Sequence, residues 1–125
     1  MRATIKPIVV VLLAILPLTA EAQNGTAGPP CSDQVSTMDI TACVDKDRQL
    51  WDKRLNAAYQ ALLQFVDPGQ REPLRKAQRL WIQYRDTNCG FYGAHEGSIS
   101  QILFANCMWT MTRDRTVEME QDARP

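Results

Sequence analysis

The sequence has few of the residues on which most enzymes depend. His95 is the single histidine, and the chain contains no phosphate-binding, dinucleotide-binding, serine-hydrolase or zinc-protease motif. Carboxylates occur in pairs, Asp45 with Asp47 and Glu118 with Glu120, but at these helical positions they favour a charged, solvent-facing surface. His95 lies in a glycine-rich stretch, which favours a surface contact over a general base. The sequence therefore predicts a protein that is not an enzyme and needs no cofactor.

An excess of basic residues is also missing. The 14 Lys and Arg balance the 14 Asp and Glu, and loss of an N-terminal segment with Arg2, Lys6 and Glu21 would leave a net charge of about −1. A nucleic-acid binder would carry a basic face, and a membrane-surface binder would carry a polybasic cluster. Neither class is predicted, and strong electrostatic steering toward a very basic partner is not expected.

Long apolar runs are absent beyond the first residues of the chain. Arg2 and Lys6 precede an apolar stretch over 8–16, and small residues follow at Ala20 and Ala22. This order is typical of a secretory signal peptide, and the run is shorter than the roughly 20 residues of a membrane span. No cysteine follows Ala22 directly, so we expect cleavage there and no lipid anchor. The expected organisation is a signal peptide at 1–22, an arm at 23–35, a helical domain at 36–121 and a tail at 122–125, in a periplasmic or secreted protein.

Four cysteines are present, and all of them follow the expected cleavage site. They are spaced 12, 46 and 18 residues apart, without the close pairs of a zinc site, so no metal is predicted. Four cysteines in a small exported domain predict two disulfides. The cysteines are Cys31, Cys43, Cys89 and Cys107.

The remaining pattern is helical. Ser36 with Asp39 predicts an N-terminal cap for a first helix over 37–66, and Asp67, Pro68 and Gly69 would end it. A second helix is expected from about Arg71, and a third, capped by Ser98, to about Gln121, with a connection over 90–97. Apolar spacing places these residues on the inner faces: Ile40, Val44, Trp51, Leu55, Tyr59, Leu62, Val66, Leu74, Ala77, Trp81, Tyr84, Leu103, Phe104, Cys107, Met111 and Met119.

Short connections make neighbouring helices antiparallel, so we expect an all-α, antiparallel three-helix bundle stapled by two disulfides. Cys43 and Cys107 would then lie at a similar height on parallel helices, which favours Cys43–Cys107 together with Cys31–Cys89. The pairing of Cys31 with Cys43 and of Cys89 with Cys107 stays open as the alternative.

Several polar residues lie at or beside the inner faces. A buried polar group without a partner costs about 1–3 kcal/mol, so an interhelical network is expected. In it, Asp52 would pair with Arg85 or Arg115, and the amide side chains would add contacts. The expected members are Asp52, Asn56, Gln78, Arg85, Thr112 and Arg115.

The same residues form motifs. Residues 52–59 resemble the D-x-x-L-N-x-x-Y pattern of the LprI-like lysozyme-inhibitor family, and 78–89 resemble its Q-x-x-W-x-x-Y-R-D-x-x-C pattern. Residues 97–99 resemble its glycine-serine start of the last helix, and 107–115 resemble its C-x4-T-x-x-R ending. With all four cysteines in order, the resemblance spans 31–119. It implies a small secreted or periplasmic helical domain that inhibits lysozyme.

Export, the resemblance and the lack of catalytic residues together favour a periplasmic inhibitor of a lysozyme-type muramidase, either a host lysozyme or an endogenous enzyme. The alternative is a non-enzymatic binding or envelope-assembly module with a non-lysozyme partner. The glycine-rich connection is the candidate partner-binding loop, with a plain linker as its alternative. Its candidate contacts are Phe91, Tyr92, His95, Glu96 and Ser98.

Overall fold

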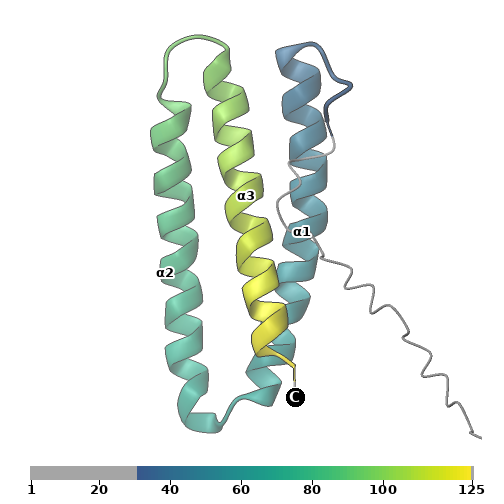
Figure 1. Ribbon diagram of the computed structural model, residues 1–125. Coiled ribbons are helices and arrows are strands. Elements are labelled where there is room, and N and C mark those ends of the chain that lie inside the picture. The colour runs from purple at the N-terminus through teal and green to yellow at the C-terminus, as the bar shows by residue number, and fades with distance from the viewer. Residues whose placement is uncertain (1–30, 125) are drawn as a thin grey trace, which may run out of the picture.

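The computed structural model describes residues 31–124, so the expected signal peptide and most of the expected arm lie outside the described residues. Three helices make up the fold: α1 (Thr37–Phe65), α2 (Pro68–Gly93) and α3 (Ile99–Asp122). The expected all-α, antiparallel three-helix bundle is confirmed. The α2 helix runs opposite to α1 and α3, and α3 lies between α1 and α2 (Figure 1).

Local chemistry explains where α1 ends and α2 begins. The Ser36 hydroxyl accepts a hydrogen bond from the Asp39 N–H (3.1 Å) and donates one to the Asp39 carboxylate (2.6 Å), so the expected cap is present. The extended backbone of Val66, one residue before Asp67, ends α1. The α2 helix begins at Pro68, three residues before the expected start, because proline suits the first helical position and needs no N–H partner there.

The hydrophobic core lies mainly between α1 and α3. One cluster of buried residues contains Cys31, Val44, Ala105 and Trp109, and a second contains Leu55, Ala58, Leu62 and Met119. The α1 and α2 helices each pack along α3 rather than along each other. The buried face of α2 is therefore narrow.

Part of the expected core is wrong, because some residues predicted to face inward are exposed. Ala77 and Tyr84 lie on the exposed side of α2, and Phe104 of α3 is 41% exposed. Hydrophobic spacing predicts that these residues face inward, but α2 contacts a single neighbour and buries only one narrow stripe. Phe104 lies near the start of α3, beside Gly93 of α2, and is only partly covered. Thr112 and Thr116 of α3 are fully buried instead.

The favoured disulfide pairing is wrong. The structure joins Cys31 to Cys43 (Cα–Cα 5.9 Å) and Cys89 to Cys107 (Cα–Cα 5.4 Å). A turn closed by the Gln34 N–H and the Cys31 carbonyl (3.2 Å) precedes α1, and the segment lies against the start of that helix (Figure 1). The turn brings Cys31 next to Cys43, which lies near the start of α1. Cys107 of α3 faces α2, where Cys89 lies.

Candidate functional site

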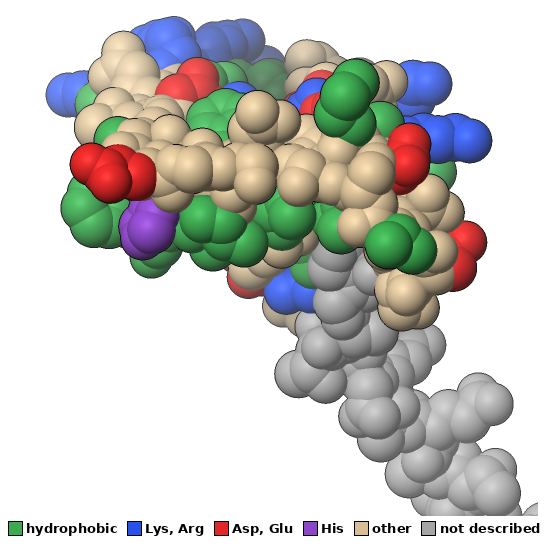
Figure 2. All heavy atoms as spheres, turned by 90° about the horizontal axis from the view of Figure 1, so that it is seen from above, with side chains coloured by type: hydrophobic (Ala, Val, Ile, Leu, Met, Phe, Trp, Pro, Cys, Tyr) green, Lys and Arg blue, Asp and Glu red, His purple; other side chains and the backbone are tan. Residues whose placement is uncertain are grey.

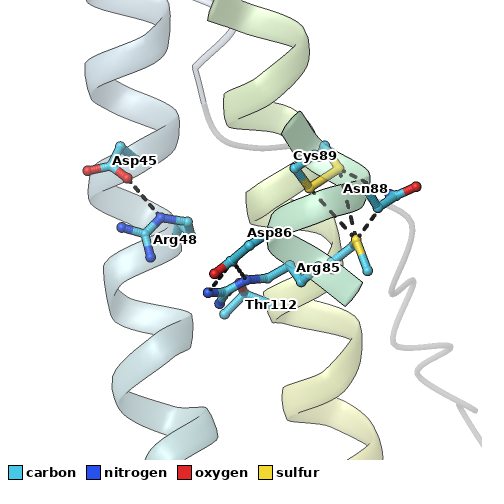
Figure 3. A network of polar contacts seen from close by, with 9 residues as sticks. Asp45, Arg48, Arg85, Asp86, Asn88, Cys89 and Thr112 are labelled. Carbon is cyan, nitrogen blue, oxygen red and sulfur yellow. Dashed lines mark hydrogen bonds and ion pairs between the residues drawn. A yellow bond between two sulfur atoms is a disulfide. The ribbon is translucent and has the colours of Figure 1, made fainter. Parts of the chain in front are cut away.

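Four of the six expected network residues join α2 to α3. Arg115 donates from Nε to the Gln78 side-chain carbonyl (3.1 Å), and Gln78 is only 6% exposed. Arg85 extends from α2 to the Thr112 hydroxyl of α3 (3.4 Å) and also pairs with Asp86 (2.8 Å), as Figure 3 shows. These contacts give hydrogen-bond partners to two buried polar side chains, Gln78 of α2 and Thr112 of α3.

The expected contact of Asp52 with Arg85 or Arg115 is wrong. Asp52 and Asn56 lie on α1, Asn56 is exposed, and neither side chain forms a hydrogen bond or ion pair with another residue of 31–124. The ion-pair partner of Arg115 is Glu118, one turn along its own helix (2.7 Å). Asp52 does not reach Arg85 because α1 does not pack along α2, and Arg115 of α3 contacts Gln78 of α2 instead.

A polar contact between α1 and α3 is not predicted by the sequence. The Asp47 carboxylate accepts hydrogen bonds from the indoles of Trp51 (3.1 Å) and Trp109 (2.6 Å). Arg113 lies over the Trp109 ring, 4.5 Å from its centroid. The spacing of four residues between Asp47 and Trp51 is the pattern that could have indicated this role, whereas a solvent-facing position was expected. Glu120, also expected to face solvent, pairs with Arg54 of α1 (2.8 Å).

One carboxyl group in this region has a shifted pKa. Burial acts to raise the pKa of Asp45, but hydrogen bonds from Arg48 (2.8 Å) and Gln49 (2.8 Å) outweigh it and hold the pKa below its ordinary value. The group is thus a stabilised anion in a local ion pair (Figure 3). Its geometry suits a helix surface and gives no indication of proton transfer.

The candidate binding loop is shorter than expected. The α2 helix continues through Gly90 to Gly93, because the Ala94 N–H donates to the Gly90 carbonyl (3.0 Å). Phe91 and Tyr92 therefore lie in the last turn of α2, with their rings packed edge to face at 5.3 Å. Only residues 94–98 connect the helices.

The polar candidates lie in that connection. His95, Glu96 and Ser98 are exposed, and His95 Nδ1 lies 3.0 Å from the Glu96 carbonyl. Ser98 does not cap α3 through its side chain, contrary to expectation, because it already has helical backbone angles. Figure 2 looks down on this end and shows the histidine beside acidic and hydrophobic side chains.

The candidate residues border a shallow hollow, and the start of α1 adds to the same end of the molecule. The hollow has a volume of about 240 Å³ and is lined by Phe91, Tyr92, Ala94, His95 and Leu103. A neighbouring hollow brings Thr41 of α1 beside Gly93 and Phe104. Half of the large hydrophobic side chains that are exposed in the structure belong to this end. We call it the loop end, and its exposed hydrophobic residues are Val35, Met38, Phe91, Tyr92, Ile99 and Phe104.

Residues 31–124 lack the features of two other kinds of site. No helix there is both long and apolar enough to cross a membrane. Within 31–124, no three His, Cys, Asp or Glu side chains gather closely enough to hold a metal ion. The loop end is the candidate functional site because the predicted contact residues and exposed hydrophobic side chains lie there together.

The chain is similar to known sequences over nearly all of the described region. The family model described as "Lysozyme inhibitor LprI" matches residues 31–119. A protein of Rhizobium meliloti (strain 1021), named "Uncharacterized protein R02472", is 36% identical, and the alignment covers 88% of this chain and 90% of the relative. No solved structure matches the chain.

Proposed function

Because this chain belongs to the lysozyme inhibitor LprI family, we propose that it binds and blocks a lysozyme-type muramidase. The expected signal peptide would deliver it to the periplasm or the exterior, where such enzymes act. A muramidase cleaves its substrate with two carboxyl groups in an open cleft. An inhibitor need only occupy that cleft or cover its mouth.

The observation that supports this proposal most directly is the exposed aromatic pair beside a disulfide. Phe91 is 75% exposed and Tyr92 is 43% exposed, although both follow Cys89, which is completely buried. Aromatic side chains are the residue type on which binding energy concentrates at protein interfaces.

The supporting structure of the loop end lowers the entropic cost of binding. The bond from Cys89 to Cys107 ties the end of α2 to α3, and Phe104 packs against the backbone of Gly93. A surface that is already ordered loses less conformational entropy when a partner binds. The loop end therefore suits tight binding by a small domain.

A turbidity assay with purified protein, several muramidases and a cell-wall substrate tests the proposal. The wild-type protein should slow lysis and form a complex with at least one of the enzymes on a sizing column. Replacing Phe91, Tyr92, His95 and Glu96 by Ala should weaken inhibition at least about tenfold, since two aromatic anchors are lost.

The matched control is the double variant Leu80→Ala/Tyr84→Ala. These side chains are 54% and 62% exposed and lie on α2 away from the loop end. Their loss should leave inhibition unchanged. Unaltered potency of the quadruple variant would exclude the loop end as the binding surface, and absence of both inhibition and complex with every enzyme would refute the inhibitor function.

A further inference from the structure

The charges of the molecule are unevenly distributed although they nearly balance. Segments 31–44 and 87–112 contain three acidic residues, Asp33, Asp39 and Glu96, and neither Lys nor Arg. All three are exposed, and none forms an ion pair with another residue of the described region. Farther along the helices, six carboxylates have cationic partners: Asp45, Glu72, Asp86, Asp114, Glu118 and Glu120. The loop end therefore carries uncompensated negative charge.

These carboxylates belong to the same end as the exposed apolar side chains. Figure 1 shows the start of α1 and the α2–α3 connection at one end of the bundle. Asp33 and Asp39 flank Val35 and Met38, which are 94% and 78% exposed, and Glu96 follows the aromatic pair in the connection. Thr41 lies one turn after Met38, and Thr41 and Gly93 line the same hollow.

We infer that the loop end binds a cationic protein surface, and that the start of α1 is part of the interface. The inference rests on the proposed inhibitor function and names the chemistry of its target. Apolar contacts would form over Met38 and Phe91, while Lys or Arg side chains of the partner would face Asp33, Asp39 and Glu96. A neutral or acidic partner would bury these carboxylates without compensation, and that carries a large desolvation cost.

The local charge matters more than the net charge for such an encounter. At physiological ionic strength the screening length is about 8 Å, so an approaching protein responds to the end that it meets and not to the opposite end of the bundle. The net charge of about −1 therefore does not describe the loop end, which is locally acidic. Two copies meeting through their loop ends would repel each other, because like charges would face across the contact.

The test compares two triple variants that remove the same number of negative charges. Asp33→Asn/Asp39→Asn/Glu96→Gln neutralises the loop end, and the Asn at 39 keeps an oxygen for the Ser36 hydroxyl. The control replaces three exposed carboxylates elsewhere: Glu72→Gln/Asp114→Asn/Asp122→Asn. Both are measured against a basic muramidase that the wild-type protein inhibits, and against that enzyme after succinylation of its lysines.

The loop-end variant should associate about tenfold more slowly than the wild type at low ionic strength, and the difference should shrink as salt is added. The control should associate at nearly the wild-type rate, and succinylation should weaken binding of the wild-type protein. Glu96→Gln alone, which replaces no helix cap, should show a smaller effect of the same sign. It keeps the test decisive if the triple variant fails to fold.

The outcomes separate the two proposals. If the wild type inhibits but the loop-end variants associate with the native enzyme as fast as the wild type does at low ionic strength, the cationic-partner inference is overturned and the inhibitor function stands. Concentration-dependent self-association of the wild type that the loop-end variant abolishes would also overturn it. If the wild type inhibits no muramidase, the function fails and the inference fails with it.

Discussion

Trp109 of α3 donates a hydrogen bond from its indole N–H to the carboxylate of Asp47 on α1, across 2.6 Å. The same carboxylate oxygen accepts a second indole N–H from Trp51, at 3.1 Å. Trp109 is only 4% exposed, so its N–H has no access to bulk water as a substitute partner. One carboxylate thus holds two tryptophans in the contact between α1 and α3.

Asp47→Ala should lower the free energy of unfolding by about 2–3 kcal/mol, because it leaves a buried indole N–H without an acceptor. Asp47→Asn should cost less, since an amide oxygen can still accept. Urea denaturation monitored by tryptophan fluorescence measures both. Asp52→Ala on the same helix is the control and should change stability by less than about 0.5 kcal/mol. Equal stability of Asp47→Ala and the control would show that this contact does not stabilise the fold.

Hydrophobic spacing and turn chemistry were sufficient to predict the fold class. Ser36 and Pro68 act within one or two turns, so their effects can be derived from neighbouring residues alone, whereas Gly90 and Gly93 lie within α2 and did not end it as expected. The inward positions predicted for Tyr84 and Phe104 were wrong because spacing identifies an apolar stripe but not whether a neighbour covers it. Only the packing of both outer helices on α3 decides that.

Long-range pairs were harder to predict than helices. The sequence suggested that Asp52 would reach Arg85 or Arg115, yet Asp47 and Trp109 are the pair that joins two helices, 62 residues apart. The disulfide prediction failed for a related reason, since Cys107 faces α2 and bonds to Cys89 rather than to a cysteine of α1. Rotation of a helix about its axis depends on its packed neighbours, which the sequence of that helix does not contain.

The disulfide pairing can be tested by digestion with trypsin without reduction. No Lys or Arg lies between Cys31 and Cys43, and none lies between Cys89 and Cys107. Each disulfide should therefore lie within one peptide, ending at Lys46 or at Arg113 and lighter by two hydrogens than its reduced form. Either crossed pairing would instead join these two peptides into a single species, so mass spectrometry distinguishes the arrangements directly.

Arg115→Ala should destabilise the protein by about 2 kcal/mol, because the buried side chain of Gln78 loses its donor. Inhibition by the fraction that stays folded should be unchanged, since Arg115 lies on α3 away from the loop end. Arg75→Ala, which removes only an exposed arginine, provides the control and should have little effect on stability. Loss of inhibition by folded Arg115→Ala protein would place Arg115 in the binding surface.

The pH dependence of stability should include a small contribution from Asp45. Its pKa in the folded protein lies below the ordinary value of 3.8, so the ion pair stabilises the fold above that pH and the contribution is lost as the pH falls toward the folded pKa. The side chain is 46% exposed, which limits the effect to less than about 1 kcal/mol. Asp45→Asn should therefore be less stable than the wild type at pH 7 and approach it in acid. A difference that stays constant between pH 7 and pH 2 would contradict this explanation.

Two glycines near the loop end should respond oppositely to substitution by alanine. Gly90 lies within α2 with open space where a Cβ would be added, so Gly90→Ala should stabilise the protein by about 0.5–1 kcal/mol. Gly97 has a φ of +80°, which L-residues rarely adopt, so Gly97→Ala should destabilise it by about 1–2 kcal/mol. Thermal or urea unfolding of the two variants beside the wild type gives both signs. If α2 ended before Gly90, as the sequence pattern suggested, Gly90→Ala would gain no stability from helix propensity. A neutral or destabilising result would therefore indicate that α2 ends earlier and that Phe91 and Tyr92 belong to the connection.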